Sequence, residues 1–199
     1  MRSGRVEAFS DAVIAIVMTV MVLELRVPSS TTWDALKPLV PVFLTYVLSF
    51  VYLGIYWNNH HHLLQATERV NGAVLWANLH LLFWLSLFPF STAWMDRSHF
   101  SRVPVMVFGI DLLGAAIGYY VLQQSILRGQ PADAPLARAV GRDVKGKLSP
   151  VCYVAGIAAA AFSRGRLDAW IWVALAFFVA VAVLWLVPDR RIERVLAER

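Results

Sequence analysis

The sequence predicts an all-α integral membrane protein with six transmembrane helices. Of the 199 residues, 59% are hydrophobic and only 16% are charged, and the mean hydropathy is +0.60. This is the composition of a membrane protein and not of a soluble domain. The apolar residues also form six long runs, and most of the charged residues lie in the connections between them, as in multi-pass helical proteins.

The first three expected spans are each bounded by turn-forming or polar residues. Residues 4–27 stop at Pro28, because proline cannot continue a helix. The second span, 34–64, is followed by the polar turn 68–72, and the third span, 72–95, begins there.

The last three spans complete a single transmembrane domain over residues 1–199. The fourth span, 103–127, carries one charge, Asp111, and the sequence Gly114-Ala-Ala-Ile-Gly118, a pattern of small residues that allows helices to approach closely. A basic loop separates it from the short, alanine-rich fifth span, 148–163. The sixth span, 169–187, is followed by a charged tail, 188–199.

The distribution of basic residues predicts the orientation. Twelve of the 18 lysines and arginines lie on one side of the predicted bundle, together with both termini. Cytoplasmic connections carry the excess of basic residues, so we expect both termini in the cytoplasm and the protein in the cell membrane. The net charge of +5 therefore does not indicate a nucleic-acid partner. The single Cys152 excludes a disulfide framework within one chain.

The first span is expected to be an inner helix of the bundle. Arg5, Ser10 and Asp11 open a run, 12–23, that is otherwise almost entirely apolar. Those twelve residues cover about 18 Å, against about 30 Å of hydrocarbon. The polar ends must therefore lie at membrane depth, where only protein or water can surround them.

Helical geometry places one apolar stripe on this span. Relative to Ile16, Val20 lies at about +40°, Leu23 at about −20° and Thr19 at about −60°. Asp11 lies about 140° away and faces the second and third spans. A buried carboxylate needs polar partners, and His60, Asn59 and Asn78 are the groups available there. Arg5 lies about 120° from Asp11, so the two are not an intrahelical pair. Arg5 is either a positive-inside anchor or contacts another helix or subunit.

The run His60-His61-His62 does not predict a metal site. Adjacent helical residues are about 100° apart, so the three imidazoles cannot converge on one ion. We expect one histidine to be buried in an interhelical hydrogen bond and the others to lie near the membrane surface. The sequence also lacks a phosphate-binding glycine loop, a nucleophile elbow and an HExxH motif. Neither an enzyme nor a cofactor is therefore predicted.

Three motifs in order resemble one family. Arg5-x-x-x-Phe9-Ser10-Asp11 is similar to the RxxxFSD signature of the endosomal and lysosomal potassium channels and their bacterial homologues. Trp57-Asn-Asn-His60 and Asn78-Leu, with Leu87-Phe-Pro89-Phe90, resemble the family's patterns in the second and third helices. Length and span count agree with the bacterial form over the whole chain.

The resemblance implies a homotetramer in which the first helix of each subunit lines a central pore. The narrowest layer of that pore would be Ile16, followed by Val20 and Leu23, and Thr19 would contribute to selectivity. A larger leucine often stands at the position of Val20, so the second layer is expected to be wider here. No TVGYG-like filter segment is present.

The sequence is therefore interpreted as a potassium-permeable channel with a hydrophobic constriction, embedded in lipid, with other monovalent cations also admitted as permeant ions. His60 is expected to reach Asp11 or Ser10 from the second helix. Two alternatives stay open. One is a secondary transporter or proton-coupled exchanger with Asp11, Asp111 and a histidine as its relay, and the other is a non-conducting membrane scaffold.

Overall fold

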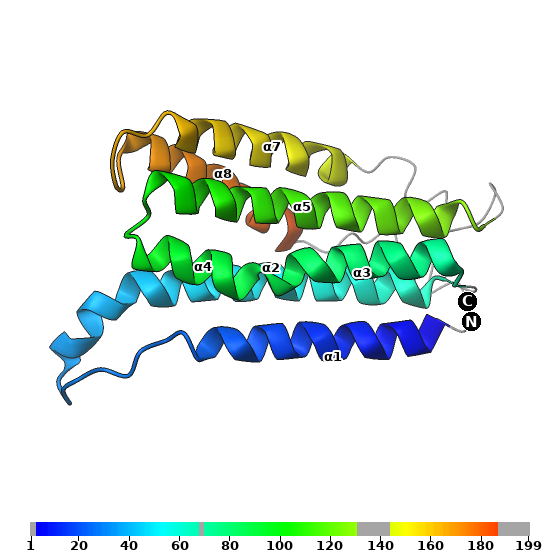
Figure 1. Ribbon diagram of the computed structural model, residues 1–199, viewed down its shortest axis with the longest axis horizontal. Helices are drawn as coiled ribbons and strands as arrows, with labels where there is room; N and C mark the ends of the chain where they lie inside the picture. The colour runs from blue at the N-terminus through cyan, green and yellow to red at the C-terminus, as the bar shows by residue number, and fades with distance from the viewer. Residues whose placement is uncertain (1–2, 68–69, 131–143, 187–199) are drawn as a thin grey trace.

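The computed structural model describes residues 3–67, 70–130 and 144–186 and shows an all-helical bundle (Figure 1). This confirms the expected all-α architecture. Most of the basic loop, residue 187 and the charged tail lie outside the described residues. Within this part of the chain, six helical rods are formed: α1 (Ser3–Val22), α2 (Val40–Gln65), α3 (Gly72–Ser86) continued by α4 (Phe88–Arg97), α5 (Arg102–Leu127), α7 (Val144–Ala161) and α8 (Ala169–Leu186).

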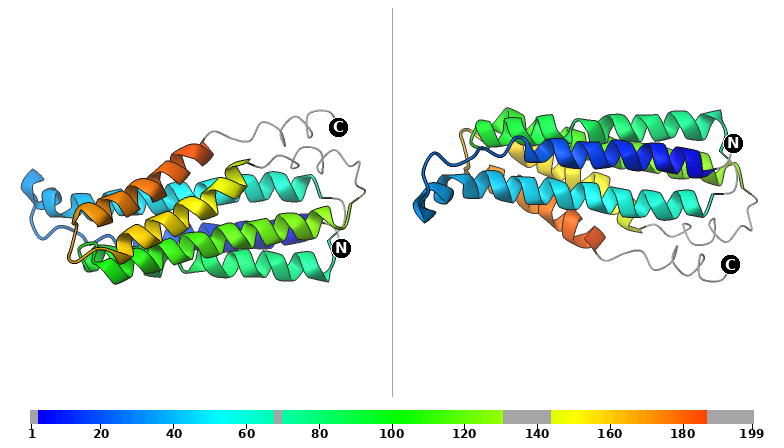
Figure 2. Two further views of the ribbon diagram at one scale, coloured as in Figure 1. Left: turned by 90° about the horizontal axis from the view of Figure 1, so that it is seen from above. Right: turned by 90° about the horizontal axis from the view of Figure 1, so that it is seen from below.

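Helix α1 lies on the outside of the bundle formed by one chain, so the inner position expected for it is not found within a single subunit. It packs against α2, α3 and α4, while α7 and α8 pack on the far side of α5 (Figure 2). One long face of α1 is therefore left without a neighbour among the described elements.

The second rod starts later than expected. Helix α2 begins at Val40, not at residue 34, and a 3₁₀ helix, Trp33–Leu39, precedes it. Pro38 has no N–H to donate, and its ring clashes with the preceding turn of an α-helix. Pro41 lies in the first turn of α2, where a helix tolerates proline.

The third rod is broken, and the same physical cause applies. Leu87 separates α3 from α4, and Pro89 occupies the first turn of α4. A proline in a helix interior removes a backbone hydrogen bond, so a new helix starts at this point. The expected span 72–95 is thus two helices that together end at Arg97.

Helix α1 ends at Val22, five residues earlier than expected. Beyond it, the N–H groups of Leu23 and Glu24 bond to carbonyl groups three residues earlier, at 3.0 and 3.3 Å. Such bonds tighten the end of a helix. Glu24 then forms an ion pair with Arg97 at the end of α4. Leu23 therefore lies in the turn after α1, not within the helix.

The fifth and sixth rods are close to their expected positions. Helix α7 begins at Val144, four residues before the expected start, and ends at Ala161. The Asp168 carboxylate, just before α8, accepts hydrogen bonds from the N–H groups of Ile171 and Arg164, at 3.1 and 2.9 Å. It thus satisfies a free donor at the start of α8 and holds the preceding loop against it.

In the described part of the chain, four helical segments are long and apolar enough to cross a membrane: Trp33–Gln65, Gly72–Arg97, Arg102–Leu127 and Ala169–Leu186. Helices α1 and α7, which carry charged residues near their N-terminal ends, fall outside this group. The 20 residues of α1 nevertheless measure about 30 Å, which matches the hydrocarbon thickness. The length and apolar composition of these helices are those of a multi-pass membrane protein.

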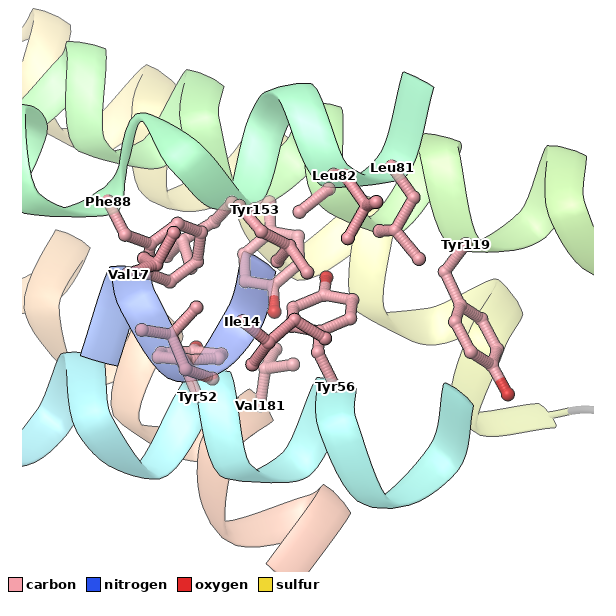
Figure 3. Packing of buried hydrophobic residues seen from close by; sticks show 14 of the residues in the cluster. Ile14, Val17, Tyr52, Tyr56, Leu81, Leu82, Phe88, Tyr119, Tyr153 and Val181 are labelled. Atoms are coloured by element: carbon pink, nitrogen blue, oxygen red, sulfur yellow. The ribbon is translucent and has the colours of Figure 1, made fainter. Parts of the chain in front are cut away.

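Aromatic side chains fill the centre of the bundle. The ring of Phe108 lies 6.2 Å from that of Phe88 and 5.9 Å from that of Phe178, both edge-on. Tyr52 lies 6.3 Å from Phe88, again edge-on (Figure 3). Such contacts stabilise aromatic pairs beyond the burial of their area. They join α2, α4, α5 and α8 into one core.

The small-residue pattern in α5 is a contact within the chain. A Cβ atom on Gly114 would lie 2.2 Å from the ring of Trp84, and one on Gly118 would lie 2.9 Å from the Cα of Leu81. Both partners belong to α3, so the glycines allow α3 and α5 to approach closely.

Gly118→Ala is expected to destabilise the protein by roughly 1–3 kcal/mol, because the new methyl group meets backbone that cannot move cheaply. Gly54→Ala is the control, since its Cβ would meet only the terminal methyl of Met18, at 4.0 Å. Thermal unfolding of both variants in detergent measures the difference. Equal melting temperatures would show that α3 and α5 can move apart without loss of thermal stability.

Candidate functional site

The two long faces of α1 have opposite surroundings. One face is buried against the rest of the chain and consists of Val6, Ser10, Ile14, Val17 and Met21. The other face is open: Ile16 is 61% exposed and Leu23, just after the helix, is 80% exposed. Val20, Thr19 and Phe9 are exposed as well.

We call Ile16, Thr19, Val20 and Leu23 the α1 stripe. Three of its members are apolar, and its one hydroxyl group donates a hydrogen bond to the carbonyl of Ile16, 2.8 Å away. That bond occupies the only hydrogen of Thr19 Oγ1, so the oxygen can still accept. An open apolar face of this kind requires lipid, another protein surface or a pore.

The buried face of α1 is held by a polar network that spans three helices. The Asn78 amide of α3 donates to Ser10 Oγ of α1 at 2.9 Å. His60 Nε2 of α2 lies 2.7 Å from Asn78 Oδ1. Because that oxygen only accepts, Nε2 carries the hydrogen. All three side chains are at most 1% exposed. Ser10 Oγ also donates to the carbonyl of Val6 at 2.8 Å.

The direct contact expected from His60 to Ser10 or Asp11 is not formed. Asn78 lies between His60 and Ser10 and contacts both. A carboxamide can donate and accept at once, so it bridges a hydroxyl and an imidazole better than either could pair with the other. The sequence placed Asn78 in this region but did not predict that it would be the centre of the network.

Asp11 has a different partner from the expected ones. Its carboxylate accepts a hydrogen bond from Trp57 Nε1 of α2 at 3.0 Å. One turn earlier on α1, Glu7 Oε1 lies 2.7 Å from His61 Nδ1, a contact that becomes an ion pair when the imidazole is protonated. The rings of Trp57 and His61 are stacked, 5.9 Å apart.

These two contacts form a ladder between α1 and α2 that the sequence analysis missed. A signal for it was present. Glu7 and Asp11 are four residues apart, and so are Trp57 and His61, which places each pair on one helix face. In an antiparallel helix pair the two spacings match, so both rungs form together.

The remaining titratable candidates do not take part in the contacts of this ladder. Arg5 is exposed and forms no ion pair within the described residues. Asp111 is 2% exposed and accepts a hydrogen bond from Ser91 at 2.7 Å. The ring of His62 contacts only that of His61, 5.6 Å away, among the ring pairs of this part of the chain. In the described ranges, no three histidine, cysteine or acidic side chains are grouped to hold a metal ion.

The fold and this site define a multi-pass α-helical membrane protein whose first helix buries polar residues on one face and exposes an apolar stripe on the other. A family model described as the endosomal/lysosomal potassium channel TMEM175 matches residues 5–89, from α1 into α4. A protein named as a potassium channel in Chryseobacterium sp. (strain P1-3) is 48% identical over 198 residues, which is the full length of both chains. The chain therefore belongs to the TMEM175 family, and the family predicted from its motifs is confirmed.

One further relative agrees with this assignment, and one solved structure shares the fold. A protein named as a potassium channel in Streptomyces collinus is 34% identical over 150 residues, covering 69% of this chain and 73% of its own. The crystal structure of a TMEM175 homologue from Chamaesiphon minutus, titled a lysosomal potassium-selective channel, matches with a TM-score of 0.73 at 24% identity. It covers 94% of this chain and 97% of its own, so the two proteins share a fold.

The first prediction from the site concerns the network. Asn78→Ala leaves Ser10 and His60 without their shared partner and is expected to cost about 1–3 kcal/mol for each stranded group. His60→Ala should add little to it, because residues in one network are not additive. Asn58→Ala is the control, as Asn58 forms no hydrogen bond through its side chain to the described residues. Full additivity in a double-mutant cycle of unfolding would contradict the network.

The second prediction concerns the ladder. Asp11→Ala and Trp57→Phe each remove one side of the same hydrogen bond, so both should lower thermal stability and the double variant should be less destabilised than their sum. We expect ion selectivity to change less than stability. A stable Asp11→Ala variant with altered selectivity, measured as a reversal potential, would instead make Asp11 an ion-interacting group.

Proposed function

We propose that the protein is a potassium-permeable channel of the prokaryotic cell membrane, formed by four copies whose α1 helices line a central path. The whole-length similarity to a protein named as a potassium channel supports the ion. The α1 stripe supports the path, and it is the observation that carries the proposal.

Lipid is a poor neighbour for the open face of α1. Arg5 is exposed at one end and Glu24, with its partner Arg97, is partly exposed at the other. Charged side chains at the ends of a 20-residue helix are costly in contact with hydrocarbon. They are stable where water or protein surrounds them. In a pore made by copies of α1, the charged ends would contact water, and the α1 stripe would contact the apolar side chains of the other copies.

Within such a path, Ile16 would form the narrowest ring. A ring of isoleucines excludes water when it is narrow, so it can act as a gate by dewetting and as a size barrier. Val20 and Leu23 would form the next layers. Because valine is smaller than leucine, the layer at Val20 would leave a wider path. The Thr19 oxygen, whose hydrogen is held by the Ile16 carbonyl, would offer lone pairs to a passing cation.

The excess of basic residues on the side of both termini supports a cytoplasmic location for them. A transporter with a proton relay has weaker support. Asp11 bonds to Trp57, Asp111 to Ser91 and His60 to Asn78. Within the described residues no hydrogen bond links any two of the three proposed relay groups.

Ile16→Asn is expected to increase single-channel conductance and to weaken discrimination against Na⁺, because a polar ring wets the constriction. The measurement is current and reversal potential in planar bilayers under a K⁺/Na⁺ gradient. Ile117→Asn is the control: Ile117 is an isoleucine that is 45% exposed, on α5 and not on the α1 stripe.

A second readout uses metal coordination. In a Cys152→Ala background, Ile16→Cys should make the current sensitive to Cd²⁺, since four thiolates would meet on the axis. If both Ile16 variants behave like the Ile117→Asn protein, Ile16 does not line the path. Absence of unitary current steps in the unmodified protein would remove the channel proposal itself.

A further inference from the structure

A second site lies on the side of the bundle away from the α1 stripe. A cleft opens between α2, α5, α7 and α8, and none of the residues that line it belongs to α1. Its volume is about 510 Å³ with the open mouth included. Tyrosine rings and Trp185 make up much of the wall.

Two largely buried polar side chains of this cleft have no hydrogen-bond partner among the described residues. Gln123 is 4% exposed and Tyr56 is 9% exposed, and neither side chain forms a hydrogen bond with any described residue. Buried polar groups are normally paired. Neighbouring groups in the same cleft obey that rule, since Trp185 Nε1 donates to Ser149 Oγ at 2.8 Å. The carboxamide and the phenol are therefore available to an occupant.

Both available groups are neutral, so they suit a neutral hydrogen-bonding group such as an ester carbonyl or a hydroxyl. A phenol and a carboxamide donate to ester oxygens without the desolvation cost of a charge. The rest of the lining is mostly aromatic and aliphatic, which suits hydrocarbon.

The mouth of the cleft is basic. Lys145 Nζ lies 5.8 Å from the centre of the Trp185 ring. Gly146 lines the cleft between Lys145 and Lys147. These residues are in the first turn of α7, which begins short of the ends of α2 and α5 (Figure 2). A lysine can extend its apolar stem along the wall of a bundle, and its ammonium group is suited to an anionic headgroup.

We propose that this cleft binds one anionic phospholipid of the membrane. The ester region accepts hydrogen bonds from Gln123 and Tyr56, the phosphate lies beside Lys145, and an acyl chain leaves along the apolar wall toward the bilayer. The site stands apart from the ion path and does not depend on the channel proposal.

The test is native mass spectrometry of the purified full chain after addition of phosphatidylglycerol or of phosphatidylcholine with the same acyl chains. The unmodified protein should retain phosphatidylglycerol in preference to phosphatidylcholine. Gln123→Leu and Tyr56→Phe should each lower retention about fivefold, the loss of one buried hydrogen bond. Lys145→Gln should remove the preference between the two lipids and leave retention of phosphatidylcholine unchanged.

Gln124→Leu is the matched control, because it is the same change one residue further along α5, outside the cleft lining. Ala116→Leu fills the cleft without touching either polar group and should also displace the lipid. Melting temperatures without added lipid separate binding from folding. Equal retention by the Gln123→Leu and Gln124→Leu proteins, or no lipid preference in the unmodified protein, would overturn the proposal. A cleft that retains only water or detergent would do the same.

Discussion

The arrangement of α1 depends on the hydrogen bonds of the Asn78 carboxamide. It bonds to Ser10 on α1 and to His60 on α2, and all three groups are shielded from water. Inside a membrane-embedded bundle, a polar group that loses its partner cannot turn to water instead. This network therefore fixes the rotation of α1 about its own axis. Once Ser10 faces inward, helical geometry turns Ile16 outward.

The two ends of α1 are fixed by different means. Near its N-terminal end, Asp11 and Glu7 contact Trp57 and His61 on α2. At its other end, Glu24 pairs with Arg97 on α4. The partly exposed pair contributes little energy by itself, as surface ion pairs usually do, but it sets where the chain leaves the helix. Together these contacts hold α1 against the bundle although one face of the helix is not packed against the chain.

The sequence predicted the fold better than it predicted the contacts. Apolar runs predicted the rods because their length is set by membrane thickness. The helix ends were less predictable. The start of α2 at Val40 depends on proline geometry, and the end of α1 at Val22 depends on the Glu24 contact. The periodicity of apolar residues carries no information about either. The rotation of α1 was predictable from the angles around Ile16. The role of Asn78 and the rungs to Trp57 and His61 were not, because they require knowledge of which faces of α2 and α3 meet α1.

The two sides of the bundle differ in chemistry. Residues 5–89, the part matched by the family model, include α1, α2, α3 and the network that orients the stripe. Helices α5, α7 and α8, which follow in the chain, contribute most of the residues that line the cleft, and α5 also contributes the close glycine contacts with α3. Helix α2 belongs to both, since His60 bonds to Asn78 in the network and Tyr56 lines the cleft one turn away.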